Sequence, residues 1–250
     1  MVLRTAAGLV LPFLLWVNFG AAVDYTIGAM DANKEAGGKQ VPMVTALRLG
    51  DRTDEQGFPL AVSWNKVIAV RFDHDWKGQN SSPARATEVR VLWTPETLFL
   101  RFVANYQTLN VYSEARNDGW KDELWERDVA EAFLQPDSSD ALKYKEIEVA
   151  PNGFWVDLDI SHGERAELRS GLKRRVVLDE KEKTWTAELA IPLKALTPAF
   201  DARREWRVNF FRVEGGGEPR FYSTWSPTYS EKANFHVPEA FGRLVFRERE

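Results

Sequence analysis

The sequence predicts an all-β protein, an antiparallel β-sandwich of the jelly-roll-like kind, built as one domain with an N-terminal arm. Short runs rich in β-branched and aromatic residues follow one another at close spacing, which is typical of sandwich domains. Turn-forming residues separate these runs, and the chain has no long apolar pattern with the 3.6-residue period of a helix. A length of 250 residues suits one sizeable domain.

The chain begins with a segment that we predict to be a cleaved secretory signal peptide, residues 1–23. The apolar run 6–19 follows Arg4, and small residues fill positions 20–22. This run has about 14 residues, fewer than the roughly 20 that span a bilayer, so no membrane anchor is expected after cleavage. We therefore expect an exported protein, periplasmic or extracellular. The absence of cysteine excludes a disulfide framework and a lipid-modified cysteine.

Residues 24–59 are predicted to form an extended N-terminal arm. This stretch is polar and contains glycines, and its one short apolar piece runs from Val41 to Leu49. The sandwich itself is expected to occupy residues 60–250.

Strands are predicted throughout that second part of the chain. The runs expected to form them are 67–72, 88–93, 98–104, 129–134, 144–149, 154–160, 174–178, 184–190, 206–213, 221–225 and 243–246. Turn residues at 94–96, 151–153 and 179–183 separate neighbouring runs. The helical candidates are short turns near 192–196 and 238–241.

Composition argues against several function classes. The formal net charge is −4 with both signs interspersed, so nucleic acid is not an expected partner. The three histidines, at 74, 162 and 236, form no cluster with metal-ligand spacing, and the chain has no thiol, nucleophile elbow or phosphate-binding loop. Ten tryptophans are generous for a domain of this size and favour recognition of rings by stacking, although sandwich cores also use aromatics.

The most informative stretch is 124–134, which places an aromatic residue and carboxylates at the start of an apolar strand. A sugar presents a flat C–H face that packs on an aromatic ring and a rim of hydroxyls that carboxylates accept from. Trp125 and Glu131 are thus candidate ligand-binding residues. The alternative is a core strand capped by a tryptophan.

A ladder of acidic residues is expected on the hairpin that follows. With a two-residue type I′ turn at Asn152-Gly153, one face of the hairpin gathers four acids: Glu146, Glu148, Asp157 and Asp159. Like charges opposite each other are destabilising, so this face requires a bound cation such as calcium, arginines such as Arg207 and Arg212, or raised carboxyl pKa values. A solvated face that tolerates the repulsion is the alternative.

Paired acids also raise the alternative of a glycoside hydrolase, an enzyme that hydrolyses O-glycosyl bonds with two carboxyl groups about 5 to 10 Å apart. Such an enzyme needs one carboxyl group in an apolar pocket, and the residues around the four acids do not supply it. We therefore do not expect catalysis by this chain alone.

Several segments, in order from residue 64 to 246, resemble the family 9 carbohydrate-binding modules and their wider DOMON-like superfamily. The segment 125–131 resembles the family's W-E-x-D-x-V-E pattern, and 235–244 resembles its closing aromatic-x-x-P-x-x-F-G-x-L pattern. Between them, 187–192, 206–210 and 225–227 are similar to the family's E-x-x-I-P, G/W-x-x-x-N and W-S-D/P segments.

The resemblance implies a sandwich that binds the ends of glycan chains in a slot between two aromatic residues, with structural calcium nearby. It implies Trp125 and Phe235 as the stacking pair and Glu131 as a hydroxyl acceptor. Glu148, Glu146 and Asp157 are secondary ligand-binding candidates, and Asp128 and Asp159 are the metal candidates. On a straight strand Trp125 and Glu131 would lie about 20 Å apart, so Trp125 must sit on a loop that folds back.

Two positions depart from the family pattern. Phe235 replaces a tryptophan and offers a smaller platform. Glu148 stands where such modules present an arginine toward the ligand, which puts the usual polar contacts in doubt.

We interpret the chain as an exported, non-catalytic protein that binds polysaccharide or oligosaccharide and is associated with carbohydrate catabolism. No cofactor is expected apart from a structural calcium ion, and the sequence leaves protein partners open. Besides the hydrolase, one alternative is a DOMON-like haem or redox module, although the three methionines, at 1, 30 and 43, all precede the sandwich. The other is a structural or protein-interaction sandwich whose aromatics are all core.

Overall fold

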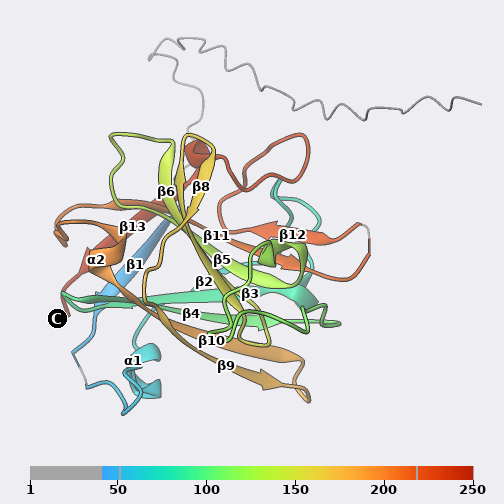
Figure 1. The fold of residues 1–250 in the computed structure, drawn as a ribbon, viewed down its shortest axis with the longest axis horizontal. Helices are drawn as coiled ribbons and strands as arrows, with labels where there is room; N and C mark the ends of the chain where they lie inside the picture. The colour runs from blue at the N-terminus through green and yellow to red at the C-terminus, as the bar shows by residue number, and fades with distance from the viewer. Residues whose placement is uncertain (1–40, 51, 218, 250) are drawn as a thin grey trace, which may run out of the picture. The chain divides into compact units, whose positions relative to one another are not determined.

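The computed structural model describes residues 41–50, 52–217 and 219–249, and almost all of its regular structure is β-strand (Figure 1). The strands are β1 Met43–Arg48, β2 Val70–Phe72, β3 Thr87–Trp93, β4 Thr97–Asn105, β5 Val129–Gln135, β6 Lys143–Val149, β7 Trp155–Ser161, β8 Glu164–Glu167, β9 Lys173–Asp179, β10 Thr184–Pro192, β11 Trp206–Glu214, β12 Phe221–Thr224 and β13 Gly242–Arg247. The helical turns are α1 Ala61–Trp64, η1 Pro83–Arg85, η2 Leu124–Glu126, α2 Leu193–Leu196 and η3 Pro238–Ala240. The predicted signal peptide and residues 24–40 of the predicted arm lie outside the described residues.

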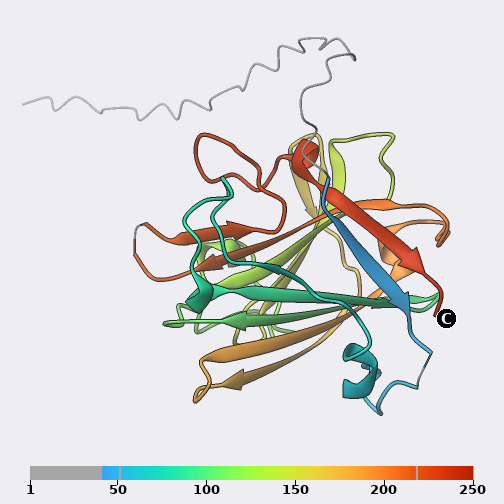
Figure 2. The ribbon, with the colours of Figure 1, turned by 180° about the vertical axis from the view of Figure 1, so that it is seen from behind.

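The strands form one curled sheet in the order β8-β7-β6-β5-β11-β13-β1-β3-β4-β10-β9, with β12 beside β11 and β2 beside β3 (Figures 1 and 2). The main hydrophobic core holds residues from β5, β6 and β11 together with residues from β3, β4 and β10. The rings of Phe102 in β4 and Phe210 in β11 meet edge to face, 6.0 Å between centroids. The two halves of the sheet therefore pack face to face, which confirms the predicted all-β sandwich.

Strand β1 lies at the centre of this sheet, within the stretch that the sequence analysis assigned to the arm. It pairs in parallel with both β13 and β3, whereas the other strand pairs of the described chain are antiparallel. Its Val44 and Ala46 are buried while Met43 is exposed, the alternation of a strand with one face on the core. Residues 43–48 thus belong to the sandwich, and their short apolar run was too weak a signal to show it.

Close packing holds β1 and β13 in place. A Cβ atom on Gly242, the first residue of β13, would lie 2.7 Å from the carbonyl oxygen of Pro42 and 2.5 Å from the indole ring of Trp225. Both distances are too short for a side chain. The glycine in the family's F-G pattern is therefore required here by the approach of the chain just before β1.

The β6–β7 hairpin has a different register from the one predicted. The amide N–H of Gly153 donates to the carbonyl of Ala150 at 2.9 Å, and Gly153 has a φ of +84°. This is a type I turn followed by a left-handed glycine, because Pro151 favours the second position of a type I turn. The register shifts by one residue, so Glu148 pairs with Val156 and not with Asp157.

The shift separates the predicted ladder of acids onto two faces. Asp157 pairs with Ile147 of the main core, and Asp159 pairs with Lys145. Glu146 and Glu148 face the opposite side.

In the described part of the chain, no helix is long and apolar enough to cross a membrane.

Candidate functional site

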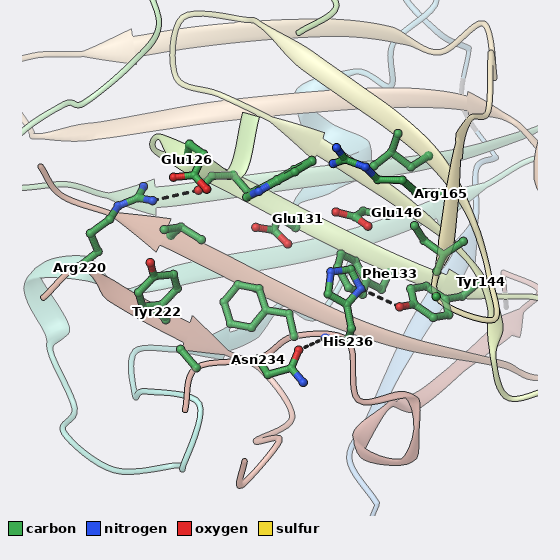
Figure 3. A pocket seen from close by; sticks show the side chains of 17 residues that line it. Glu126, Glu131, Phe133, Tyr144, Glu146, Arg165, Arg220, Tyr222, Asn234 and His236 are labelled. Atoms are coloured by element: carbon green, nitrogen blue, oxygen red, sulfur yellow. Dashed lines mark hydrogen bonds between the residues drawn. The ribbon is translucent and has the colours of Figure 1, made fainter. Parts of the chain in front are cut away.

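A pocket of about 430 Å³ opens on the outer face of the sheet formed by β5, β6, β7 and β11, on the side away from the main core (Figure 3). Its aromatic lining consists of Trp125, Phe133, Tyr144, Tyr222 and Phe235. Its charged and polar lining consists of Glu126, Glu131, Glu146, Arg165, Arg220, Asn234 and His236. An apolar lining with a few polar groups, at this volume, is typical of small-molecule sites.

Strand alternation decides which side chains reach the pocket. In β5, Ala130, Ala132 and Leu134 point into the main core, whereas Glu131 and Phe133 point outward into the pocket. Because Phe133 pairs with Glu146, the neighbouring strand β6 presents Glu146 on the same side. The sequence run that predicted a site at Glu131 thus folds into the floor of the pocket.

Three glutamates meet at this floor. Glu131 pairs directly with Glu148 across β5 and β6, and carboxylate oxygens of Glu131, Glu146 and Glu148 lie within 4.8 Å of one another. The side chains are 2%, 3% and 0% exposed, respectively. Glu131 and Glu146 line the pocket, side by side in Figure 3, whereas Glu148 lies beneath and does not line it.

These carboxylates have few protein partners. Oε1 of Glu131, Oε2 of Glu146 and both oxygens of Glu148 are buried and accept no hydrogen bond among the described residues. Burial, and then the charge of the neighbouring glutamates, raises the pKa of Glu131 and of Glu148 well above the usual range. The floor therefore disfavours three ionised carboxylates unless positive charge accompanies them.

One wall of the pocket is Trp125, in the turn η2. Nη1 of Arg220 donates to the carbonyl oxygen of Trp125 at 2.9 Å, and the guanidinium of Arg165 lies 4.8 Å from the ring centroid. Because η2 folds back over the sheet before β5 begins, Trp125 and Glu131 line the same pocket although they lie six positions apart in the sequence.

The carboxylate of Asp128 fixes this fold-back. Its Oδ1 accepts from the amide of Gly215 at 2.8 Å, and its Oδ2 accepts from the amide of Asn110 at 3.0 Å. The two loops that carry these amides are thereby tied to the start of β5. Asp128 acts as an anchor for the wall.

Another part of the pocket wall is formed by Phe235 and the residues that flank it. Phe235 is 9% exposed and stacks on Phe211 of β11, with 4.2 Å between centroids and 15° between planes. Nδ1 of His236 lies 2.7 Å from the hydroxyl of Tyr144, and the amide N–H of His236 donates to Asn234 at 3.0 Å (Figure 3). Phe235 is thus a firm wall supported from behind.

The structure brings Trp125, Glu131, Glu146 and Phe235 together in one pocket, with Glu148 beneath them. Asp157 is not in the pocket, because the shifted register turns it to the core side. There Oδ1 accepts from Nε1 of Trp120 at 3.3 Å and Oδ2 accepts from the amide of Ser170 at 2.7 Å.

The metal candidates Asp128 and Asp159 do not fit a calcium site. Both oxygens of Asp128 accept backbone amides, and Asp159 forms an ion pair with Lys145 at 2.5 Å. Among the described residues, the group with metal-ligand spacing is Glu131, Glu146 and Glu148.

Of the two arginines expected to compensate the acids, Arg212 lowers the pKa of Glu131 through its charge, although it has other contacts as well. Arg212 is fully buried on the core side, where it pairs with Ala130, and it lies 3.8 Å from Glu214. Arg207 donates to the carbonyl oxygens of Glu239 and Phe241.

The pocket residues that sequence reasoning missed include Tyr144, Arg165, Arg220, Tyr222, Asn234 and His236. The two-residue period of β6 links Tyr144 to Glu146, and that signal was available. Arg165 and Arg220 come from β8 and from the loop before β12, which no local pattern connects to the pocket.

Comparison with known proteins gives a consistent picture. The model of the family described as carbohydrate family 9 binding domain-like matches residues 59–249. An "extracellular protein" of the fungus Arthroderma benhamiae is 25% identical over 200 residues, which cover 73% of this chain and 86% of that protein.

Solved structures share the fold. A putative carbohydrate-binding protein from Bacteroides uniformis superposes with a TM-score of 0.67 at 18% identity, covering 83% of this chain and 100% of that one. A family 9 carbohydrate-binding module from Caldicellulosiruptor kristjanssonii, solved with cellotriose, gives a TM-score of 0.57 at 14% identity and covers 84% and 95%. The same module with glucose gives the same TM-score and identity, with 84% and 97% covered.

Proposed function

The chain belongs to the carbohydrate family 9 binding domain-like family, as its sequence motifs indicated, and from this premise we propose that it binds carbohydrate non-covalently in the pocket described above. One observation carries the proposal: the pocket combines aromatic walls with a floor of carboxylates in about 430 Å³. Aromatic faces pack on the C–H face of a sugar ring, and carboxylates accept from its hydroxyls.

Each group in the pocket has a role in this binding. Trp125 and Phe235 are the walls between which a ring enters, and Glu131 and Glu146 accept hydroxyl protons from the floor. Asn234 and His236, both exposed at the rim, offer further polar groups. Because Phe211 covers one face of Phe235, this wall contributes less stacking area than Trp125 does.

The ligands of the related module guide the choice of sugar. That module was solved with cellotriose and with glucose, so the end of a β-glucan chain is the first ligand to test. The replacement of an arginine by Glu148 leaves this floor acidic, which favours neutral or cationic sugars over uronic acids.

Export and a place in polysaccharide catabolism complete the proposal. The predicted signal peptide and the name of the fungal relative, an extracellular protein, support an extracytoplasmic location. There the chain would hold polysaccharide fragments for enzymes that degrade them.

The test is binding of the full chain to a glycan array, followed by calorimetry with each glycan that is retained. Trp125→Ala is expected to weaken binding at least about tenfold, since aromatic anchors in a pocket dominate binding energy. Tyr229→Ala removes an exposed aromatic outside the pocket and serves as the matched control. The melting temperature of each variant is measured first, so that binding is compared only between variants of matched folding stability.

Two outcomes would overturn the proposal: no glycan is retained, or Trp125→Ala binds as tightly as the unmodified chain. Release of reducing sugar in the same samples would favour the hydrolase alternative. A haem absorption band in the spectrum of the purified protein would favour the haem alternative.

A further inference from the structure

The three glutamates at the floor of the pocket pose a problem that sugar binding does not solve. Glu148 is 0% exposed, and neither of its oxygens accepts a hydrogen bond among the described residues. A sugar hydroxyl in the pocket reaches Glu131 and Glu146, which line it, but not Glu148 behind them. A buried ionised carboxylate without a partner is costly, and a cation held by all three glutamates would remove that cost.

The nearest cationic side chains attract these glutamates, Arg212 and Arg220 acting on Glu131 and Arg165 on Glu148, but each also has other contacts. Arg212 is on the core side of the sheet. Arg165 lies over the ring of Trp125, and Arg220 donates to backbone carbonyl oxygens at the rim.

The spacing of the oxygens matches a single metal ion. Calcium binds carboxylate oxygens at about 2.4 Å, so two oxygens that share one ion lie at most about 4.8 Å apart. The oxygens of Glu131, Glu146 and Glu148 all meet this limit. Three carboxylates supply between three and six of the six to eight oxygens that calcium takes.

The depth of Glu148 distinguishes an ion from an organic cation. An amino group carried on a sugar ring must enter with its ring, and the ring stops at Glu131 and Glu146. A bare ion fits between the three carboxylates and contacts all of them. We propose that Glu131, Glu146 and Glu148 form a site for a hard divalent cation, calcium in the first place, at the floor of the pocket.

The site is open on one side, because Glu131 and Glu146 line the pocket (Figure 3). The coordination positions on that side are filled by water or by the hydroxyls of a ligand. This last step rests on the proposed function: calcium then links the floor to the sugar, and sugar affinity depends on calcium.

The test uses the full chain after chelator treatment, titrated with CaCl₂ in a calorimeter without any sugar. One ion per chain is expected to bind, with a rise in melting temperature. Glu148→Gln keeps the size of the side chain and removes a ligand charge; it is expected to weaken calcium binding at least about tenfold. Asp159→Asn, an acid of the same hairpin on the other face, is the control and is expected to bind as the unmodified chain does.

Glu146→Gln provides a second variant should Glu148→Gln fail to fold. The site is overturned if neither calcium, magnesium nor manganese gives heat or a thermal shift, or if both glutamine variants bind calcium normally. A sugar titration with and without calcium separates the two proposals, since calcium binding without sugar supports the metal site even where no glycan binds.

Discussion

The two faces of the β5–β6–β7 layer both bury acids, but they treat them in opposite ways. On the core side, Asp157 has a donor for each oxygen, from Trp120 and from Ser170. On the pocket side, Glu148 is equally buried and has none among the described residues. Burial alone therefore does not identify a functional acid. The presence or absence of protein donors is what distinguishes the two acids.

The difference has an energetic meaning. Removing an acid whose donors are buried leaves those donors unsatisfied, which destabilises the fold. Removing an acid that has no donor relieves repulsion and desolvation. Mutations of acids on the two faces are thus expected to change the free energy of unfolding in opposite directions, and experiments can test this difference.

The largest effect is expected for Asp157→Ala. Without the carboxylate, the indole N–H of Trp120 and the amide N–H of Ser170 have no acceptor. Each unsatisfied donor destabilises the fold by about 1–3 kcal/mol. We expect the free energy of unfolding to fall by about 3 kcal/mol in urea denaturation. A loss below about 1 kcal/mol would show that water replaces these bonds and would remove the contrast between the faces.

Asp128→Asn is expected to be next. The asparagine amide cannot accept from both backbone N–H groups, so one of the bonds from Gly215 and Asn110 is lost. We expect a loss of about 2 kcal/mol in the same denaturation experiment. Sugar affinity should fall as well, because the turn that carries Trp125 is loosened. Unchanged affinity would show that Asp128 does not position Trp125 for binding.

A pH titration sharpens the pocket side of the comparison. The pKa of Glu148 is raised in the folded chain, so its stabilising contribution is fully present below about pH 4.5 and is lost as pH rises through the folded pKa. In chelator, the stability of the unmodified chain should therefore fall with pH above about 4.5. Glu148→Gln should reduce this slope by up to about 1.4 kcal/mol per pH unit. An identical slope in the variant would contradict it.

The smallest effect is expected for Asp159→Asn. Its partner Lys145 is at 2.5 Å, but the aspartate side chain is 44% exposed. Exposed ion pairs contribute less than about 1 kcal/mol, so unfolding should change within that range. A larger loss would mean that this side of the hairpin is less solvated than its exposure indicates.

Most of the strands could be predicted from the sequence, because runs of β-branched and aromatic residues correspond to β-strands in this fold. Each predicted run overlaps a strand, and the two predicted helical turns coincide with α2 and η3. The misses are instructive. Strand β8 is a short and polar edge strand without the pattern of a half-buried strand, and β1 is a single short apolar run isolated in a polar stretch.

Pocket residues could be predicted where the pattern of a single strand places them, but not where their face depends on the register between two strands. Glu131 follows from the pattern of β5 alone. Asp157 was assigned to the wrong face because Pro151 selects a type I turn with a glycine bulge, and one residue of slip reverses every side chain of a strand. Arg165 and Arg220 reach the pocket from other segments through tertiary contacts that a single sequence does not encode locally.

The central position of β1 has a consequence for the order of folding. Arg48 of β1 bonds to Glu248, 200 residues later, and β1 separates β13 from β3 in the sheet. A nascent chain that lacks its last strand therefore leaves one side of β1 unpaired, and the two halves of the sheet stay disconnected. Pairings of such long sequence separation form slowly. During synthesis, β1 would therefore lack one of its two partners until β13 has been made.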